Sequence, residues 1–387
     1  MSLDDFIGLA SERGASDLHL EAGMPPTLRV RGSLQAIGEP VPGETLLAIA
    51  QAILSKEQWK GFVRRRSADL AKTVRGVRCR INILQSTRGT GLAVRLLHQS
   101  QPTLEQLNLH PDLARLAHHN HGLILVSGPT GSGKSSTLAA LVHELNSTEA
   151  RHIVTLERPV EFVFRPRKAF IRQREVEKDT PSFSRGLLDA MREDPDVLMV
   201  GEMRHPETVR LTLNAAETGH LVLSTVHSAT VAEALHRVVS AFPSEIQPLV
   251  CSQLADCLRA VICQRLTFKK DLEIRVPECQ ILIGTTPAKS LIRQGHFFKL
   301  EQVLETGARQ GQFTLQRYRS WLAGRTSFHV PDPEARESAE AEEPVRIPRP
   351  APARTSAPPP PSDDDDVIVI QPPTESLADI LDELNES

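Results

Sequence analysis

The glycine-rich stretch at residues 128–135, Gly-Pro-Thr-Gly-Ser-Gly-Lys-Ser, constrains the fold of this chain more than any other segment. It matches the pattern G-x-x-x-x-G-K-[ST], in which the backbone N–H groups of a loop surround phosphate oxygens. The apolar run 123–126 before it predicts a buried strand, and 136–145 predicts the helix that follows. The alternative is a strand–helix turn that binds no nucleotide. The spacing and the flanks favour a phosphate loop at a helix N-terminus, and therefore bound ATP.

The loop offers two chemically distinct side chains as well as its backbone. Lys134 is expected to reach the β- and γ-phosphates, and the Ser135 hydroxyl is expected to hold Mg²⁺. ATP and Mg²⁺ are therefore the predicted cofactors. The residues expected to surround the nucleotide are Gly128, Pro129, Thr130, Gly131, Ser132, Gly133, Lys134, Ser135 and Ser136.

Cysteine usage and hydropathy limit the class of protein. The five cysteines include no C-x-x-C pair, which disfavours a zinc site or a disulfide scaffold and fits a reducing compartment. Cys251, Cys257 and Cys263 are expected in one helix as core residues. The N-terminus lacks a signal peptide, and no apolar run approaches the roughly 18 residues of a membrane-spanning helix. These features predict a cytoplasmic chain without membrane insertion.

Charge is distributed very unevenly along the chain. Residues 331–387 contain 15 acidic residues and 4 arginines, a net charge of −11, so the first 330 residues carry +8 within the total of −3. The same segment holds 12 of the 28 prolines and no aromatic residue, which predicts a disordered acidic tail. Within it, 376–386 has the apolar spacing of a short amphipathic helix. That helix is expected either to dock on a separate, unknown protein or to pack against the basic part of its own chain.

The rest of the chain divides into two patterns. Residues 1–97 predict a small mixed α/β domain, 98–110 a linker, and 111–330 an α/β domain in which strands alternate with helices. The first domain is expected to contain helices at 3–10 and 45–54, a strand at 17–20, a hairpin at 27–37, and strands at 68–74, 77–84 and 91–97. The second is expected to contain strands at 123–126, 152–156, 170–174, 197–200 and 221–226, and a helix over 246–265. A mostly parallel sheet with these helices is a RecA-like nucleotide-binding core.

Acidic residues follow two of these strands. Glu202 ends an apolar run, which is where P-loop folds place an acid near Mg²⁺ and water. Glu157 and Glu161 are four residues apart around a proline, so one of them could orient or deprotonate the attacking water. A solvated turn with two surface acids is the alternative for this second segment.

Histidines and arginines supply further candidates. His220 and His227 bracket an apolar strand at an odd spacing, so they are no simple metal pair; each could contact phosphate or stabilise a strand end. Arg80 and Arg95 lie in a cluster of arginines in the first domain. Alternation places Arg78 and Arg80 on one face of their strand. That face is either solvated or supplies an arginine to the ATP site of a neighbouring chain.

Together these segments resemble the type II/type IV secretion and pilus motor ATPases, and within that family the retraction branch. The resemblance extends from about residue 2 to residue 324. The matching motifs are an amino-terminal signature at 15–21 and 25–32, Walker A at 128–135, an aspartate box at 157–162, Walker B at 201–204 and a histidine box at 219–227.

The resemblance implies a PAS-like amino-terminal domain, a RecA-like P-loop ATPase domain and a homo-hexameric motor that drives type IV pilus retraction and twitching motility. It implies that Glu161 is the general base and that Glu202 is the acid for Mg²⁺ and water. His227 joins the catalytic residues, His220 contacts the nucleotide, and Arg80 and Arg95 act across the subunit interface. The implied partners are an inner-membrane platform protein and another pilus ATPase paralogue, with the motor peripheral at the inner face of the membrane.

Three departures from the family pattern keep other functions open. Arg158 replaces the aspartate of the aspartate box, His205 replaces the acid after Walker B, and the retraction motif is half preserved at 288–294. An accessory or non-hydrolysing adaptor of a pilus motor is therefore one alternative. A secretion or extension ATPase is another, disfavoured because no platform-binding domain precedes residue 15. A nucleic-acid translocase is disfavoured because no basic patch is interleaved with aromatic residues.

Overall fold

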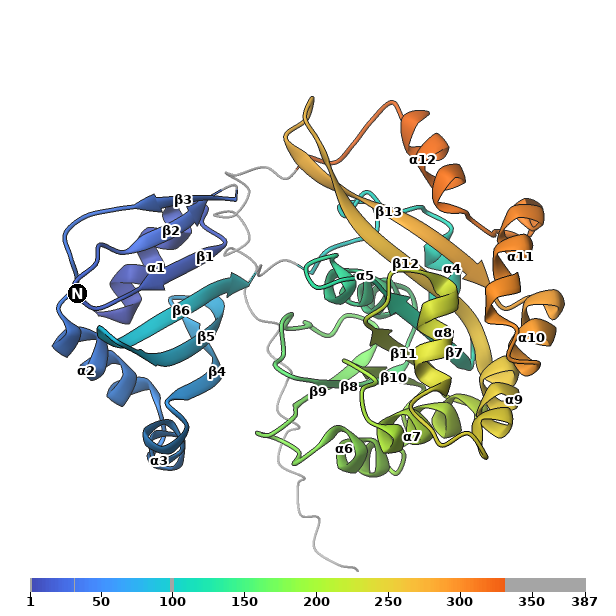
Figure 1. Ribbon diagram of the computed structural model, residues 1–387, viewed down its shortest axis with the longest axis horizontal. Helices are drawn as coiled ribbons and strands as arrows, with labels where there is room; N and C mark the ends of the chain where they lie inside the picture. Colours follow the sequence, from blue (N-terminus) through green and yellow to red (C-terminus); the bar gives the residue numbers. More distant parts are fainter. Residues whose placement is uncertain (1, 31, 98–100, 331–387) are drawn as a thin grey trace, which may run out of the picture. The chain divides into compact units, whose positions relative to one another are not determined.

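The computed structural model describes residues 2–30, 32–97 and 101–330, in which the strands form two sheets (Figure 1). The predicted tail 331–387, its helix at 376–386 and part of the predicted linker lie outside these residues. The domain boundaries therefore remain predictions. Within the described residues, no helix has the length and hydropathy that crossing a membrane requires.

The described part of residues 2–97 forms a sheet of six antiparallel strands in the order β3-β2-β1-β6-β5-β4. The first helix begins after Ser2, whose hydroxyl accepts the N–H of Asp5 in a capping box. One helix, α3, was not predicted from the sequence. The elements are α1 (Leu3–Glu12), β1 (Asp17–Leu20), β2 (Thr27–Val30), β3 (Ser33–Ala36), α2 (Gly43–Ile53), α3 (Lys56–Arg65), β4 (Ser67–Val74), β5 (Val77–Ser86) and β6 (Gly89–Leu97).

The two faces of this sheet differ in polarity because successive strand residues point to opposite faces. One face packs against α1 and α2 through a core that includes Phe6, Ile7, Leu46, Ile81 and Val94. On the other face, Asp17 lies in register with Arg29 on one side and Arg95 on the other. Arg95 in turn lies opposite Arg80. A row of three arginines and one aspartate thus crosses the polar face.

The second sheet has seven strands among the described residues, in the order β13-β12-β7-β11-β10-β8-β9 (Figure 1). Six of them run parallel, and β13 lies antiparallel on β12. The five strands predicted here are confirmed, as is the α/β class. The elements are α4 (Leu113–Ala117), β7 (Gly122–Ser127), α5 (Lys134–Thr148), β8 (His152–Glu157), β9 (Phe170–Glu175), α6 (Phe183–Ala190), β10 (Val197–Val200), α7 (Pro206–Glu217), β11 (Leu221–Val226), α8 (Val231–Val239), α9 (Gln247–Cys257), β12 (Leu258–Lys269), β13 (Ile274–Ile283), α10 (Thr286–Arg293), α11 (Leu300–Thr306) and α12 (Leu315–Ala323).

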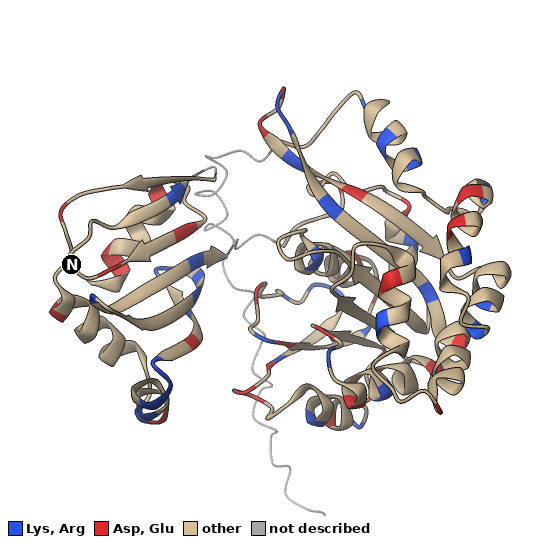
Figure 2. Ribbon diagram, viewed as in Figure 1, with Lys and Arg blue, Asp and Glu red and all other residues tan. Residues whose placement is uncertain are grey.

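Helices cover both faces of this sheet, so its central strands are buried on both sides. Leu123 and Leu125 of β7 pack with α7, α8 and α9, whereas Ile124 and Val126 pack with α4 and α5. The central strands β7, β10 and β11 carry no charged residue, and the charges lie on helices, loops and outer strands (Figure 2). A parallel sheet buried in this way requires continuous apolar runs, which is why its strands were recognisable in the sequence.

The helix predicted over 246–265 is wrong in its second half. Helix α9 ends at Cys257 and β12 follows directly. Val261 and Ile262 are β-branched, and β12 pairs with β7 on one side and β13 on the other. Strand pairing between segments remote in sequence therefore outweighs the local helical pattern. Cys263 consequently lies in a strand, although it is buried, as predicted.

A buried amide ties the strand β13 to the segment before α12. The side chain of Gln312 is fully buried; it accepts the N–H of Ile283 at 2.8 Å and donates to the Ile283 carbonyl at 3.0 Å. On α12 itself, the hydroxyl of Tyr318 accepts the N–H of His110 at 3.0 Å. The Gln312 contacts join the segment before α12 to the sheet, and the Tyr318 contact joins α12 to the segment before α4.

Candidate functional site

The candidate site lies at one edge of the larger sheet, where the carboxyl ends of β7, β8, β10 and β11 meet (Figure 1). The glycine-rich loop follows β7, and Glu161, Glu202 and His227 follow the other three strands. Hydrogen bonds hold these strand ends together: the Ser127 hydroxyl donates to the carbonyl of Ser228 at 2.7 Å. The sheet thus gathers four segments that are far apart in sequence, as open α/β sheets commonly do at a ligand site.

The glycine-rich loop turns sharply between β7 and α5. Gly133 has a φ of +85° directly before α5 begins at Lys134. A Cβ on Gly128 would lie 2.2 Å from the backbone oxygen of Gln264 on β12, so only glycine fits there. The Ser132 hydroxyl inside the turn is buried, with no hydrogen-bond partner among the described residues. Within the part of the chain that the structure describes, the Ser132 hydroxyl is therefore an unpaired polar group in the turn where a phosphate is expected to bind.

All nine predicted loop residues lie in this one turn and the start of α5, but their exposure differs. Ser135, the predicted Mg²⁺ ligand, is exposed at the first turn of the helix. Thr130 is exposed as well, so both hydroxyls are accessible to a ligand. The nine residues fall into a buried set, Gly128, Ser132 and Lys134; a half-buried set, Gly133 and Ser136; and an exposed set, Pro129, Thr130, Gly131 and Ser135.

Lys134 folds back over the loop that precedes it. Its Nζ donates to the carbonyls of Gly128 at 3.0 Å and Pro129 at 2.9 Å. Burial lowers the pKa of Lys134, while the negative charges of Glu161 and Glu202 oppose that shift. Both carboxylates are therefore close enough to act electrostatically on the lysine. The ammonium group lies where it can exchange two loop carbonyls for phosphate oxygens.

His227 and Glu202 form a second contact at the same edge. Glu202 Oε2 lies 3.8 Å from His227 Nε2 and 3.3 Å from Arg204 Nε. Burial lowers the pKa of His227, the Lys134 charge lowers it further, and the Glu202 charge opposes both. The imidazole is consequently neutral at pH 7. Arg237 on α8 donates to the carbonyl of His227, which fixes the backbone at the end of β11.

The two glutamates after β8 have different environments. Glu157 is 7% exposed, and its carboxylate accepts the Thr155 hydroxyl at 2.7 Å and the Gln173 amide at 3.1 Å. Burial raises the pKa of Glu157 to about 7, although these hydrogen bonds and one from the backbone of Glu161 act in the opposite direction. Glu161 is only half buried. Glu157 therefore stabilises the turn after β8, and Glu161 remains the carboxylate accessible to a ligand. Because Glu157 is buried, the alternative of a solvated turn with two surface acids does not describe it.

The turn that carries Glu161 rests on the edge strand β9. Glu175 at the end of β9 is buried, and its carboxylate accepts the N–H of Val160 at 3.2 Å. Arg158, which replaces the family's aspartate, points to Glu177 instead and pairs with it at 2.7 Å on the surface. The positive charge of Arg158 is thus engaged outside the site.

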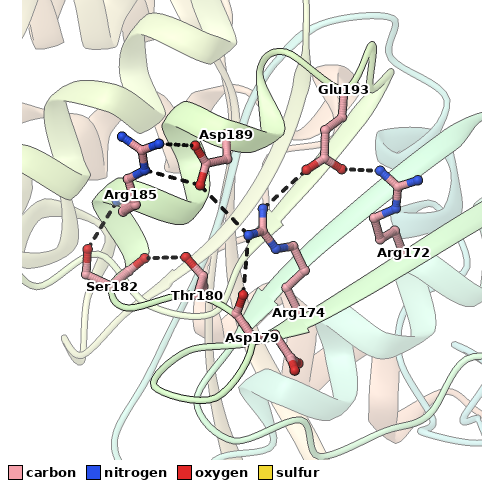
Figure 3. A network of polar contacts seen from close by, with 8 residues as sticks. All are labelled: Arg172, Arg174, Asp179, Thr180, Ser182, Arg185, Asp189 and Glu193. Carbon is pink, nitrogen blue, oxygen red and sulfur yellow. Dashed lines mark hydrogen bonds and ion pairs between the residues drawn. The ribbon is translucent and has the colours of Figure 1, made fainter. Parts of the chain in front are cut away.

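Ion pairs fasten β9 to the helix that follows it (Figure 3). Arg174 lies between Glu193 at 3.2 Å and Asp189 at 3.8 Å. Arg172 contacts the other oxygen of Glu193, and Arg185 pairs with Asp189 at 3.0 Å within α6. This network joins β9 to α6 and to the turn after it. The support beneath the Glu161 turn is consequently tied to the body of the sheet.

The structure corrects one prediction, that His220 contacts the nucleotide. Within its own chain, His220 does not lie with the other candidate residues. It precedes β11, whereas His227 follows it, and β11 runs parallel to β7. A strand of this length spans about 20 Å, so His220 is at the opposite edge from the glycine-rich loop. There its Nδ1 contacts the carbonyl of Ala215 at 3.0 Å. The alternative role, stabilising a strand end, describes this contact.

The predicted arginines lie on the polar face of the smaller sheet. Arg80 and Arg95 face each other across β5 and β6, and Cys79 is fully buried on the other side, as the alternation predicts. Arg95 Nε donates to Asp17 at 2.8 Å. Burial raises the pKa of Asp17, but hydrogen bonds from Arg95 and Ser16 outweigh it and the net shift is downward. Asp17 is thus a charged partner that orients Arg95; action on a neighbouring chain remains a prediction.

Gln264 is the residue near the loop that the sequence did not reveal. It is 4% exposed on β12, and its amide contacts the loop. The predicted helix over 246–265 concealed it, because a glutamine on a helix carries no information about a strand next to β7. A single polar residue after the apolar run 260–263 is the signal that could have identified it.

Replacing Glu157 with glutamine tests whether burial raises the pKa of this carboxyl in the folded chain. Its pKa is raised from 4.5 to about 7 in the folded chain. The folded state therefore binds a proton that the unfolded state releases, and the stability from the protonated form is lost as pH rises through this interval. We expect the thermal midpoint of the parent to fall relative to that of Glu157→Gln from about pH 5 to pH 7, and then to run parallel. A difference that is independent of pH would contradict the assignment.

Comparison with known proteins gives one consistent result. The family described as "Type II/IV secretion system protein" matches residues 2–312. The type IV pilus retractation ATPase PilT of Pseudomonas aeruginosa is 41% identical over 317 residues, which cover 81% of this chain and 92% of that protein. The twitching motility protein of Neisseria gonorrhoeae is 38% identical over 294 residues, 76% of this chain and 79% of that protein.

A solved structure agrees with these relatives. The crystal structure of the pilus retraction motor PilT with bound ADP superimposes with a TM-score of 0.74 at 36% identity, over 87% of this chain and 99% of that one. The predicted resemblance to the motor ATPases and their retraction branch is confirmed. The chain belongs to the type II/IV secretion system protein family.

Proposed function

We propose that this chain is an ATP-hydrolysing motor that forms a hexameric ring and drives retraction of a type IV pilus. The observation that carries the proposal is the meeting of the glycine-rich loop with Glu161, Glu202 and His227 at one sheet edge. The names of the similar proteins, a pilus retraction ATPase and a twitching motility protein, support the direction of work. The ADP bound to the solved relative supports the nucleotide.

Nucleotide binding requires little rearrangement of the loop. The phosphates would replace the two carbonyls that Lys134 now contacts and would lie near the buried Ser132 hydroxyl. The exposed Ser135 hydroxyl and the Glu202 carboxylate are oxygen donors of the kind Mg²⁺ prefers. Mg²⁺ bound there would neutralise charge on the phosphates. The residues present therefore fit both cofactors.

The protein groups around the phosphates have separate tasks. Glu161, accessible and held on the turn that Glu157 and Glu175 support, would orient the attacking water and take its proton. Neutral His227 beside Glu202 can donate a hydrogen bond to a phosphate oxygen or to water. A preorganised arrangement of this kind is the main contribution a protein makes to phosphoryl transfer.

The arginines are proposed to act on the site of the next chain in the ring. The polar face of the smaller sheet presents Arg80 and Arg95 side by side, with Arg95 oriented by Asp17. A guanidinium added to the site from a neighbour would stabilise charge in the transition state. Hydrolysis would then depend on contact between subunits, which is how a ring could convert ATP turnover into movement.

The proposal includes location and partners. A retraction motor would work in the cytoplasm at the inner face of the membrane, on a platform protein of the pilus, and the acidic tail would recruit a further protein. An accessory, non-hydrolysing role is the second candidate, because Arg158 replaces an aspartate. The Arg158–Glu177 pair favours the hydrolysing motor, since it places that positive charge outside the site.

The role of Glu161 can be tested by ATP turnover. Glu161→Gln keeps the shape of the side chain but removes the base, so we expect turnover to fall by about 10² to 10⁴-fold with little change in ATP affinity. Glu305→Gln, an exposed glutamate on α11, is the matched control and should turn over ATP like the parent. Parental turnover by Glu161→Gln would show that another group activates the water.

The supply of arginine between chains can be tested with mixed rings. Lys134→Ala and Arg80→Ala chains should each be inactive alone. In a mixed ring, an Arg80→Ala chain has an intact loop and receives an arginine from a Lys134→Ala neighbour, so turnover should reappear. A mixture of Lys134→Ala with Glu161→Gln is the control, because both defects lie on the loop side and no complete site can form. Equal turnover in the two mixtures would rule out action between chains.

A further inference from the structure

The side chain of Gln264 lies inside the body of the larger domain, directly beneath the glycine-rich loop. It belongs to β12, which carries none of the family's motifs, and it is 4% exposed. In register, its neighbour Cys263 pairs with Ser127, the last residue of β7. The next step along both strands therefore brings Gln264 beside Gly128, where the loop begins.

The amide of Gln264 bridges two parts of the loop-and-helix unit. Its Nε2 donates to the carbonyl of Ser132 at 2.5 Å. Its Oε1 accepts the hydroxyl of Thr137, on the first turn of α5, at 2.7 Å. Both the donor and the acceptor of the amide are therefore paired: Ser132 lies before the start of α5, and Thr137 lies in its first turn. The bridge therefore sets the angle at which the loop enters α5.

The glycines of the loop are matched to this residue. A Cβ on Gly128 would approach the backbone oxygen of Gln264 to 2.2 Å, and a Cβ on Gly133 would approach its Nε2 to 3.1 Å. The loop passes against Gln264 at both ends of the turn. Close packing against the backbone of β12 thus requires glycine at position 128, whereas at position 133 the positive φ of +85° favours glycine and the packing against Gln264 is tight.

A phosphate loop works only if its N–H groups point inward to the anion, which turns its carbonyls outward. A carbonyl turned outward into a buried position needs another donor. For Ser132 that donor is the Gln264 amide. Holding the loop in its binding shape before the ligand arrives lowers the cost of binding.

We propose that Gln264 is a positioning residue for the phosphate loop, which sets nucleotide affinity through its bridge between Ser132 and Thr137 without touching the nucleotide. This inference rests on the proposed function, in which the loop binds ATP. A purely structural role is the competing explanation, because any buried amide with satisfied hydrogen bonds stabilises a fold.

Gln312 separates these two explanations. It is another buried glutamine whose amide hydrogen-bonds at both ends, but its partners are the backbone of Ile283 and the hydroxyl of Thr285 rather than residues of the glycine-rich loop. Gln264→Leu and Gln312→Leu should both lower the thermal midpoint, since each leaves buried polar groups unpaired. Titration calorimetry of the full chain with ATP and with ADP, each with Mg²⁺, should distinguish them. We expect about tenfold weaker binding for Gln264→Leu and parental affinity for Gln312→Leu.

Thr137→Val supplies a second test if Gln264→Leu does not fold. It removes only the donor to Oε1, and we expect about threefold weaker binding. In the double variant the two effects should be less than additive, because both act through one bridge. If the parent binds ATP and either Gln264→Leu or Thr137→Val binds it with parental affinity, this inference is overturned but the proposed function is not. A parent that binds no nucleotide overturns the proposed function and this inference with it.

Discussion

The central strands of the larger sheet run parallel, and parallel strands end at the same edge. Because β7, β8, β10 and β11 lie side by side, the turns that follow them must meet, whatever their separation in sequence. The Ser127 hydroxyl and the buried bridge from Gln264 add side-chain contacts where the backbone ladder ends. The sheet itself consequently places the glycine-rich loop, Glu161, Glu202 and His227 together, and the helices on both faces bury its central strands.

Burial separates the residues that hold the site from those that would act in it. Glu157, Glu175 and Gln264 are buried and bonded to backbone or to other side chains, so each fixes one turn. Glu161 and Ser135 are accessible and leave their oxygens to a ligand. The chemical similarity of Glu157 and Glu161 is thus misleading, since burial raises the pKa of Glu157 to about 7 and its carboxyl supports the turn that carries Glu161. Positioning of this kind makes electrostatic catalysis effective.

Much of this arrangement could be predicted from the sequence, for physical reasons. Strands buried on both faces must be apolar throughout, so β7, β10 and β11 were recognisable, and the glycine-rich loop has a spacing imposed by phosphate. The predictions that failed concern features that depend on contacts between segments distant in sequence. The helix over 246–265 becomes β12 only because β7 and β13 lie beside it. His220 was misplaced because its contact with the nucleotide was inferred from the family resemblance, although the sequence puts it before β11 and so at the edge opposite the glycine-rich loop. Gln264 was missed because the strand that carries it was not predicted.

The dependence of ATP turnover on the neighbouring chain tests the account most directly. Turnover per chain would be measured over a dilution series, with the mass of the assembly determined in the same samples. If Arg80 and Arg95 complete the site of the next subunit, turnover per chain should fall in step with dissociation of the ring, and ATP should remain bound to the separated chains through the glycine-rich loop. Separated chains that hydrolyse ATP as fast as the ring would contradict the account.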